Sequence, residues 1–394
     1  MVAEIIINSS VKVLNRIFDY EIPENMNVQI GSRVFVQFGN KKVPDEGIVV
    51  GIKEKSEYKV KPILRLQEES IAKENIELAK WMAKRYICNV SDCLKLMLPP
   101  GTTSKNIVAR VKEKCINLVT LAKDVDEIQE DIDNGKIKSE KQKNVLEFLI
   151  NNENATVQDI ELFTDASRSI VNTLIKNGYL EQVEQKVERN PFLHKVEKRT
   201  FDLNLTDEQK IALESIKKTG EYLLFGVTGS GKTEIYLQLI EKALKANKSS
   251  IMLVPEISLT PQTVDRFIAR FGEEQIAVLH SKLSAGERFD QWNKIKDGRA
   301  KIIIGARSAI FAPAVNLGLI IIDEEHDESY KSEMTPRYDA KEVASFLAKQ
   351  KEIPLVLGSA TPDMNSYYKA QKGEITLLTL TKRANNASLP QVEI

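Results

Sequence analysis

Residues 226–233 read GVTGSGKT and fit the phosphate-binding loop pattern G-x-x-x-x-G-K-[ST]. Glycines let the backbone curl so that successive N–H groups point inward at phosphates. Lys232 is placed to neutralise the β- and γ-phosphates, and the Thr233 hydroxyl to bind Mg²⁺. The pattern predicts an ATP site made of Gly226, Val227, Thr228, Gly229, Ser230, Gly231, Lys232 and Thr233.

An acidic pair further along the chain supplies the partner that such a loop needs. Leu319–Ile322 is continuously apolar, which is typical of a strand buried on both faces, and it ends in Asp323-Glu324. Asp323 can hold Mg²⁺ opposite Thr233, and Glu324 can orient and deprotonate the attacking water. We therefore expect Lys232, Asp323 and Glu324 to be catalytic and the reaction to be ATP hydrolysis. The prediction requires Lys232 and Asp323 to converge on one magnesium–triphosphate cleft.

The sequence around these motifs alternates strand and helix patterns, which predicts a mostly parallel sheet with the ligand at the carboxyl ends of its strands. A helix pattern over Glu234–Ala246 follows the loop. The strand candidates are Tyr222–Phe225, Ser250–Val254, Ile276–Leu279, Lys301–Ile304, Leu319–Ile322 and Leu355–Leu357.

Length and composition limit the number of domains and the classes of function. The 394 residues suggest two or three domains, and 56 basic against 56 acidic residues give no bulk field to attract nucleic acid. Three cysteines are neither a disulfide framework nor a zinc set, so a reducing cytoplasm is expected. No run approaches membrane-spanning length, and no secretory leader is evident.

The patterns divide the chain into three predicted domains and a multidomain α/β fold class. Residues 1–104 combine short strand runs (Ile5–Ile7, Arg33–Phe38 and Gly47–Ile52) with one helix over Ala72–Arg85, which predicts a small β-barrel-like module. Residues 105–196 begin with a strand-like run, Ile107–Val119. Three helices and a strand then follow in winged-helix order, although many such modules are protein scaffolds rather than base readers. Residues 197–394 form the P-loop, RecA-like lobe with the parallel sheet. The helices of the second domain and its last strand are Ser139–Asn151, Thr156–Phe163, Ser167–Asn177 and Tyr179–Val187.

Further motifs resemble those of superfamily 2 helicases in order and spacing. Gln209 lies before the first sheet strand, as does the helicase glutamine that hydrogen-bonds adenine. The remaining matches each follow a predicted strand: LVPEISLT (253–260), HS with GER and Trp292 (280–292), GARSAIFAP (305–313) and GSATP (358–362).

The whole chain resembles the N-terminal half of primosomal protein N′ (PriA), the family of bacterial replication-restart helicases. The residues that carry this resemblance are DEEH (323–326), the aromatic-rich loop that follows it to Tyr338, and Phe18-Asp19-Tyr20. The resemblance implies that Asp19 accepts a hydrogen bond from the 3′-hydroxyl of a leading strand. Phe18 and Tyr20 would cradle the last base, with Lys61 in the same pocket. Spacing alone favours a different interpretation, in which the two rings belong to the barrel core.

The resemblance also assigns residues that contact DNA and couple it to ATP. Tyr330 and Tyr338 would stack on single-strand bases, and Lys331, Arg337 and Arg307 would contact DNA. Residues expected to couple DNA and nucleotide states to movement are His326, Ser359 and Thr361.

The family continues beyond Ile394 into a second motor lobe, with an arginine finger and a cysteine-rich zinc-binding insert. We therefore expect ATP and Mg²⁺ as cofactors here, and no zinc ligands in this chain. The implied function is 3′–5′ DNA unwinding at stalled forks and primosome assembly, by a cytoplasmic, nucleoid-associated monomer. Its partners would be forked and single-stranded DNA, single-strand-binding protein, and primosome and helicase-loader proteins. A catalytically inert fork-binding platform is the main alternative. A double-strand translocase and a small-acceptor phosphotransferase are less consistent with the motifs.

Overall fold

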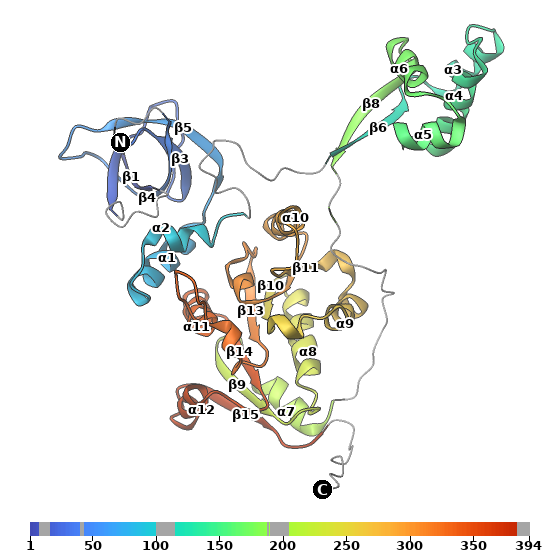
Figure 1. Ribbon diagram of the computed structural model, residues 1–394. Coiled ribbons are helices and arrows are strands. Elements are labelled where there is room, and N and C mark those ends of the chain that lie inside the picture. Colours follow the sequence, from blue (N-terminus) through green and yellow to red (C-terminus); the bar gives the residue numbers. More distant parts are fainter. Residues whose placement is uncertain (8–15, 40–42, 100–114, 187–188, 190–204, 384–394) are drawn as a thin grey trace. The chain divides into compact units, whose positions relative to one another are not determined.

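The computed structural model describes residues 1–7, 16–39, 43–99, 115–186, 189 and 205–383 (Figure 1). The chain forms two compact units, one made of Met1–Val111 with Pro191–Ile394 and the other of Lys112–Asn190. None of the helices within the described ranges is long and apolar enough to cross a membrane.

Five strands close into a barrel at the start of the chain, as Figure 1 shows, in the order β1-β2-β5-β3-β4. Inward side chains such as Ile5, Val34 and Val49 are fully buried and form its core. The predicted β-barrel is therefore confirmed. The strands and the two helices that follow are β1 Val2–Ile7, β2 Ile17–Glu21, β3 Ser32–Val36, β4 Asp45–Lys53, β5 Lys61–Ser70, α1 Lys73–Arg85 and α2 Val90–Lys95.

A seven-stranded sheet carries the predicted nucleotide motifs, in the order β11-β12-β10-β13-β14-β9-β15. All of its pairings are parallel, which confirms the predicted RecA-like lobe. Six strands were expected, and the seventh, β15, adds an edge next to β9. The strands are β9 Gly220–Gly226, β10 Ser249–Leu253, β11 Ile276–Leu279, β12 Ile302–Gly305, β13 Leu317–Ile322, β14 Pro354–Ser359 and β15 Thr376–Leu380.

Helices cover both faces of this sheet, and side chains of one strand alternate between two cores. On β13, Ile320 and Ile322 belong to the core that includes α11, whereas Leu319 and Ile321 belong to the core that includes α8. Burial on both faces explains why these strands are continuously apolar. The helices of the lobe are α7 Asp207–Ser215, α8 Lys232–Lys245, α9 Pro261–Phe271, α10 Ala285–Lys296, α11 Ala340–Lys351 and α12 Met364–Gln371. Short 3₁₀ segments are η2 Glu256–Ser258, η3 Glu273–Gln275, η4 Arg307–Phe311 and η5 Glu328–Tyr330.

The second unit packs helices against a three-stranded antiparallel sheet of order β7-β6-β8. Thr156 caps α5 through a capping box with Asp159, and Gly178 follows α6 with φ of 76°. A further helix, α3 (Val125–Asp133), precedes the three predicted ones. Most of the strand expected over residues 107–119 lies outside the described residues, and β6 begins at Cys115. The winged-helix assignment stays a prediction. The elements are β6 Cys115–Leu121, α3 Val125–Asp133, α4 Glu140–Asn152, β7 Asn154–Thr156, α5 Val157–Thr164, α6 Arg168–Lys176 and β8 Leu180–Lys186.

Candidate functional site

The phosphate-loop sequence forms a tight turn between β9 and α8. Gly229 and Gly231 adopt φ values of 82° and 84°, in the left-handed region that favours glycine. A Cβ on Gly226 would lie 2.5 Å from Ser230 Oγ, a buried atom that has no hydrogen-bond partner among the described residues. The curled backbone and a donor hydroxyl free of partners fit a phosphate group.

Lys232 opens α8 and points back over the loop. Its side chain is buried, and Nζ donates to the Gly226 carbonyl oxygen at 3.0 Å. Thr233 follows in the first turn of α8 and is half-buried. The partial positive charge of a helix N-terminus adds to that of Lys232, so the site favours an anion.

Asp323 lies at the carboxyl end of β13, and its surroundings tie it to the same site. Burial raises the pKa of Asp323, while the Tyr236 hydroxyl and the Lys232 charge act to lower it. Tyr236, from α8, donates to Asp323 Oδ1 at 2.9 Å. The structure therefore brings Lys232 and Asp323 together. A half-buried carboxylate at the end of β13 is a suitable Mg²⁺ ligand, although this role stays a prediction.

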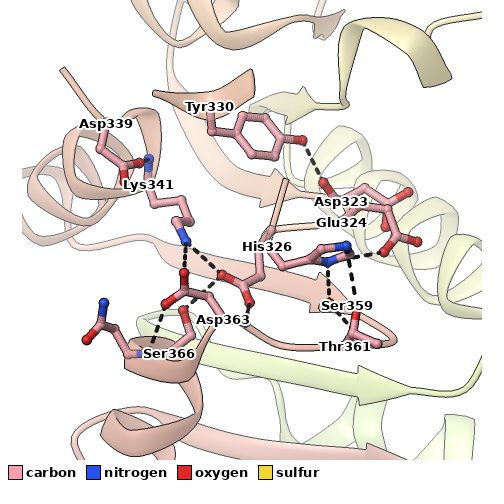
Figure 2. Close-up of polar contacts among 12 residues, drawn as sticks. Asp323, Glu324, His326, Tyr330, Asp339, Lys341, Ser359, Thr361, Asp363 and Ser366 are labelled. Atoms are coloured by element: carbon pink, nitrogen blue, oxygen red, sulfur yellow. Dashed lines mark hydrogen bonds and ion pairs between the residues drawn. The ribbon is translucent and has the colours of Figure 1, made fainter. Parts of the chain in front are cut away.

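The three residues expected to couple nucleotide and DNA states lie in mutual contact, as Figure 2 shows. The imidazole of His326 contacts Ser359 Oγ at 2.8 Å through Nδ1, and Thr361 Oγ1 at 3.4 Å through Nε2. The Thr361 N–H donates to Ser359 Oγ at 3.0 Å. Glu324 reaches the same imidazole, with Oε2 lying 3.7 Å from Nδ1. Its backbone φ of 44° is uncommon for a non-glycine residue and turns the chain at the end of β13.

Glu325 is a functional candidate that the sequence analysis did not single out. Its side chain is fully buried, and its oxygens accept from the Asp363 N–H at 2.6 Å and from Ser366 Oγ at 2.9 Å. Lys341 completes the set with an ion pair at 3.1 Å. The Glu325 N–H donates to the Gly358 carbonyl at 2.9 Å, which joins the ends of β13 and β14. The only signal in the sequence was its place between two residues that were predicted to function.

Gln209 is buried at the start of α7, where it contacts the phosphate loop. Its Oε1 accepts from the Thr206 N–H at 2.9 Å, within a capping box. Its Nε2 donates to the Ser230 carbonyl oxygen at 2.9 Å. The predicted hydrogen bond to adenine stays a prediction. In this structure the amide supports the loop.

Burial contradicts the prediction that Tyr330 and Tyr338 stack on DNA bases. Tyr330 is 1% exposed, and its hydroxyl donates to the Asp323 backbone carbonyl at 2.6 Å. Tyr338 is 3% exposed and packs edge-on against Phe311, with ring centroids 5.0 Å apart. Burial also raises the pKa of Tyr338 to about 12, although Arg307 opposes the shift. Both rings are core residues because the loop folds back onto the sheet.

Arg307, expected to contact DNA, anchors this loop from outside. Its guanidinium lies 5.7 Å from the ring centroid of Tyr338. Nη1 donates to the backbone carbonyls of Ser329, at 3.1 Å, and of Lys331. The side chains of Lys331 and Arg337 are exposed, so the loop does present positive charge to solvent.

The predicted 3′-end residues lie on the barrel and divide between core and surface. Tyr20 is 5% exposed in the barrel core, whereas Phe18 is half-buried and packs edge-on against Phe38 at 4.9 Å. The burial of Tyr20 contradicts a role for its ring in cradling a base. Lys61 is opposite Tyr20 in the β2–β5 register, is exposed, and donates to the Gly39 carbonyl at 2.8 Å.

Asp19 has partners of its own within the barrel. Its carboxylate pairs with Lys53 at 2.7 Å and accepts from the Ser56 hydroxyl. Burial raises the pKa of Asp19, but the hydrogen bonds from Lys53 and Ser56 outweigh it and lower the pKa below its ordinary value. The residue is therefore an ionised acceptor on the barrel wall, as a reader of a hydroxyl would have to be.

Comparison with known proteins agrees with this geometry. Residues 4–99 match the family model of the PriA 3′DNA-binding domain, and residues 206–369 match that of the DEAD/DEAH box helicases. The predicted resemblance to PriA is confirmed. The replication restart protein PriA of Bacillus subtilis is 37% identical to this chain, across 100% of the chain and 57% of that protein. PriA of Haemophilus influenzae is 38% identical, across 95% of the chain and 51% of that protein.

The chain thus spans about half the length of the PriA relatives it matches. Among solved structures, it is similar to the Pyrococcus furiosus Hef helicase domain, with 22% identity and a TM-score of 0.34. That match covers 44% of this chain and 37% of the other. Helicase domains of this kind use a nucleotide and Mg²⁺ in general. Within the described ranges, no three His, Cys, Asp or Glu side chains are grouped to hold a metal.

Proposed function

We propose that the chain is the DNA-end-binding and ATP-binding part of an ATP-dependent 3′–5′ DNA helicase. The complete protein would recognise stalled or abandoned forks and initiate primosome assembly for replication restart. One observation carries the proposal. A phosphate loop and an acidic strand end meet at one site, in a chain that also carries a match to a 3′DNA-binding domain.

The chain's own residues would act on the nucleotide in distinct ways. The N–H groups of the loop cradle phosphates, and Lys232 exchanges its bond to the Gly226 carbonyl for one to a phosphate oxygen. Thr233 and Asp323 would hold Mg²⁺, which when bound to ATP neutralises the charge that develops on the phosphates. Glu324 orients a water and accepts its proton.

Coupling to DNA would pass through His326. Its imidazole touches Glu324, Ser359 and Thr361, so a shift of the β14 end changes the orientation of the carboxylate that positions water. This arrangement supports the proposal that Ser359 and Thr361 report the nucleotide state to the rest of the motor. Exposed Lys331 and Arg337 would contact DNA phosphates.

On the barrel, Asp19 would accept the hydrogen bond of a terminal 3′-hydroxyl, with Phe18 and Lys61 beside it. The proposed partners beyond DNA are single-strand-binding protein and the primosome and loader proteins, met in the cytoplasm at the nucleoid by a monomer. An arginine finger from a second lobe typically contributes roughly 10³–10⁵ in rate. We therefore expect ATP turnover by this chain alone to be slow.

Binding measurements with a fluorescent ATP analogue and Mg²⁺ test the nucleotide site. Lys232→Ala is expected to weaken binding at least about tenfold, a loss of about 1.4 kcal/mol. Lys242→Ala, an exposed lysine on the same helix, is the matched control and should leave binding unchanged. Equal affinity of the Lys232 variant and the wild type would refute the site.

Fork binding tests the DNA-end site. A fork whose leading strand ends in a 3′-phosphate should bind more weakly than one with a 3′-hydroxyl, because the phosphate meets the Asp19 carboxylate. Asp19→Asn should remove this discrimination. Fork binding without any binding of the ATP analogue would instead favour the inert platform.

A further inference from the structure

The first turn of α11 joins two sets of polar contacts that lie on different elements. Asp339 caps the helix, and its side chain accepts from the Lys341 N–H at 2.8 Å. Lys341 points toward the acidic strand end, as Figure 2 shows, and contacts Glu325 at 3.1 Å and Asp363 at 3.5 Å. The next residue, Glu342, makes its contacts elsewhere. One helical turn therefore connects two networks.

The second network ends at the last residue of α1, Arg85, and its C-cap, Tyr86, inside the region that matches the 3′DNA-binding domain. The Tyr86 hydroxyl donates to Glu342 Oε2 at 2.9 Å and accepts from the Asp339 N–H at 3.3 Å. Arg85 adds an ion pair to Glu342 Oε1 at 2.7 Å. Tyr86 thus contacts both the capping residue of α11 and the residue after Lys341.

Aromatic packing supports the same contact. The Trp81 ring of α1 stacks on the Phe346 ring of α11, with centroids 4.5 Å apart and planes 21° apart. Stacked rings resist separation of the two helices but do not fix how α11 is rotated. The directional hydrogen bonds of Tyr86 supply that orientation.

The first network transmits position firmly because it is buried. Glu325 is fully buried and the Lys341 side chain is 16% exposed, so separating the pair would leave a charge without its partner. A displacement of the first turn of α11 would therefore move Glu325 with it. Glu325 lies between Glu324 and His326 in the sequence and is hydrogen-bonded to the end of β14.

We propose that Tyr86 and Glu342 are positioning residues that transmit the state of the 3′DNA-binding domain, through the first turn of α11 and Lys341, to Glu325 and the ATP site. The inference rests on the proposed function. It identifies the contact between α1 and α11 as the route by which DNA binding regulates ATP binding. Neither residue belongs to the ATP site or the DNA-end site described above. They act through Lys341.

The test measures how DNA changes the affinity for ATP. The full chain is titrated with a fluorescent, non-hydrolysable ATP analogue and Mg²⁺, alone and saturated with a partial duplex that has a free 3′-hydroxyl. Allosteric coupling typically changes affinity by roughly 5–150-fold. The coupling ratio is the affinity for the analogue with DNA divided by the affinity without it. Tyr86→Phe keeps the ring but removes the hydroxyl, and it is expected to bring this ratio close to one. The separate affinities for DNA and for the analogue should stay within about twofold of the wild type, well under the tenfold that corresponds to 1.4 kcal/mol.

Two further variants make the outcome decisive. Glu342→Ala removes the acceptor at a partly exposed position and should give the same loss of coupling. Tyr179→Phe removes a similar tyrosine–carboxylate bond, to Asp131 at 3.0 Å in the other compact unit, and should keep the wild-type ratio.

A wild-type ratio in both the Tyr86 and Glu342 variants would overturn the proposal, as would a wild-type chain that binds both ligands without coupling. In either case the proposed function would stand. A wild-type chain that binds neither ligand would overturn the proposed function and this inference together.

Discussion

Gly358 is the position where the structure predicts the sharpest effect of adding one methyl group. A Cβ at this position would lie 1.6 Å from the Tyr236 hydroxyl oxygen and 2.8 Å from the ring carbon that carries it. The nearest atoms belong to the fully buried ring of Tyr236 in α8. Overpacking of this kind costs about 1–3 kcal/mol. Displacing the ring would also weaken the hydrogen bond from Tyr236 to Asp323, and so raise the pKa of Asp323 further.

Thermal unfolding measures this cost. For a domain of this size, a loss of about 2 kcal/mol lowers the unfolding midpoint by roughly 4–8 °C. We expect Gly358→Ala to show such a fall and to bind the Mg²⁺-dependent ATP analogue more weakly, because Asp323 loses its orienting donor.

A double-mutant cycle identifies the cause. Tyr236→Phe removes the oxygen that collides with the new Cβ, although the contact at 2.8 Å to the ring remains. The double variant should therefore be less destabilised than the sum of the single variants, by at least about 0.5–1 kcal/mol. Tyr222→Phe is the control, since the Tyr222 hydroxyl donates to the Thr219 carbonyl and not to the site. Its destabilisation and that of Gly358→Ala should be additive. Simple additivity with Tyr236→Phe would refute the steric explanation.

Three other changes have distinct expected outcomes. Thr156→Ala should lower the free energy of unfolding of the 112–190 unit by about 0.5–2 kcal/mol, whereas Ser167→Ala, at an N-cap without a side-chain cap bond, should stay within about 0.5 kcal/mol. Urea unfolding that ranks the two variants equally would contradict this. Lys341→Met should cost about 3–5 kcal/mol because it leaves the buried Glu325 carboxylate unpaired, and a loss under about 1 kcal/mol would show that the pair is not what holds the strand ends. The pKa of Asp19 is lower in the folded barrel than its ordinary 3.8, so its contribution to stability is present above that pH and disappears as pH falls through the folded pKa. Urea unfolding at pH 5 and at pH 3 should then show a smaller drop for Asp19→Asn than for the wild type, and equal drops would contradict the assignment.

The central strands of the lobe could be predicted from the sequence because burial on both faces requires an uninterrupted run of apolar residues. The run Leu319–Ile322 has no polar residue to interrupt it, and its end coincides with the first carboxylate. Two other strands, β15 and β5, are less evident in the sequence. In β15 two exposed threonines interrupt the leucines within five residues, and in β5 charged side chains interrupt the apolar pattern.

The candidate site could be predicted only where function follows from local sequence. The loop residues and Asp323 are identified by spacing along the chain. Whether an aromatic or acidic side chain points inward depends instead on partners that are distant in sequence. Tyr338 contacts the Arg307 guanidinium, and Glu325 forms an ion pair with Lys341. No local sequence pattern predicts either contact. For that reason the tyrosines were assigned to a surface and Glu325 was overlooked.

The hydrogen bond from the Tyr330 hydroxyl to the Asp323 carbonyl contributes to the free-energy cost of moving this ring out of the core. Drawing this ring into solvent would forfeit about 1.5–3 kcal/mol of apolar burial and leave a carbonyl without its donor, at about 1–3 kcal/mol. Stacking on one nucleobase returns only about 1–3 kcal/mol. Exposing the ring thus costs about 2.5–6 kcal/mol in total, and stacking on one base offsets only part of that cost over most of this range. The ring thus holds the loop against the Asp323 backbone, while the side chains of Lys331 and Arg337 remain exposed.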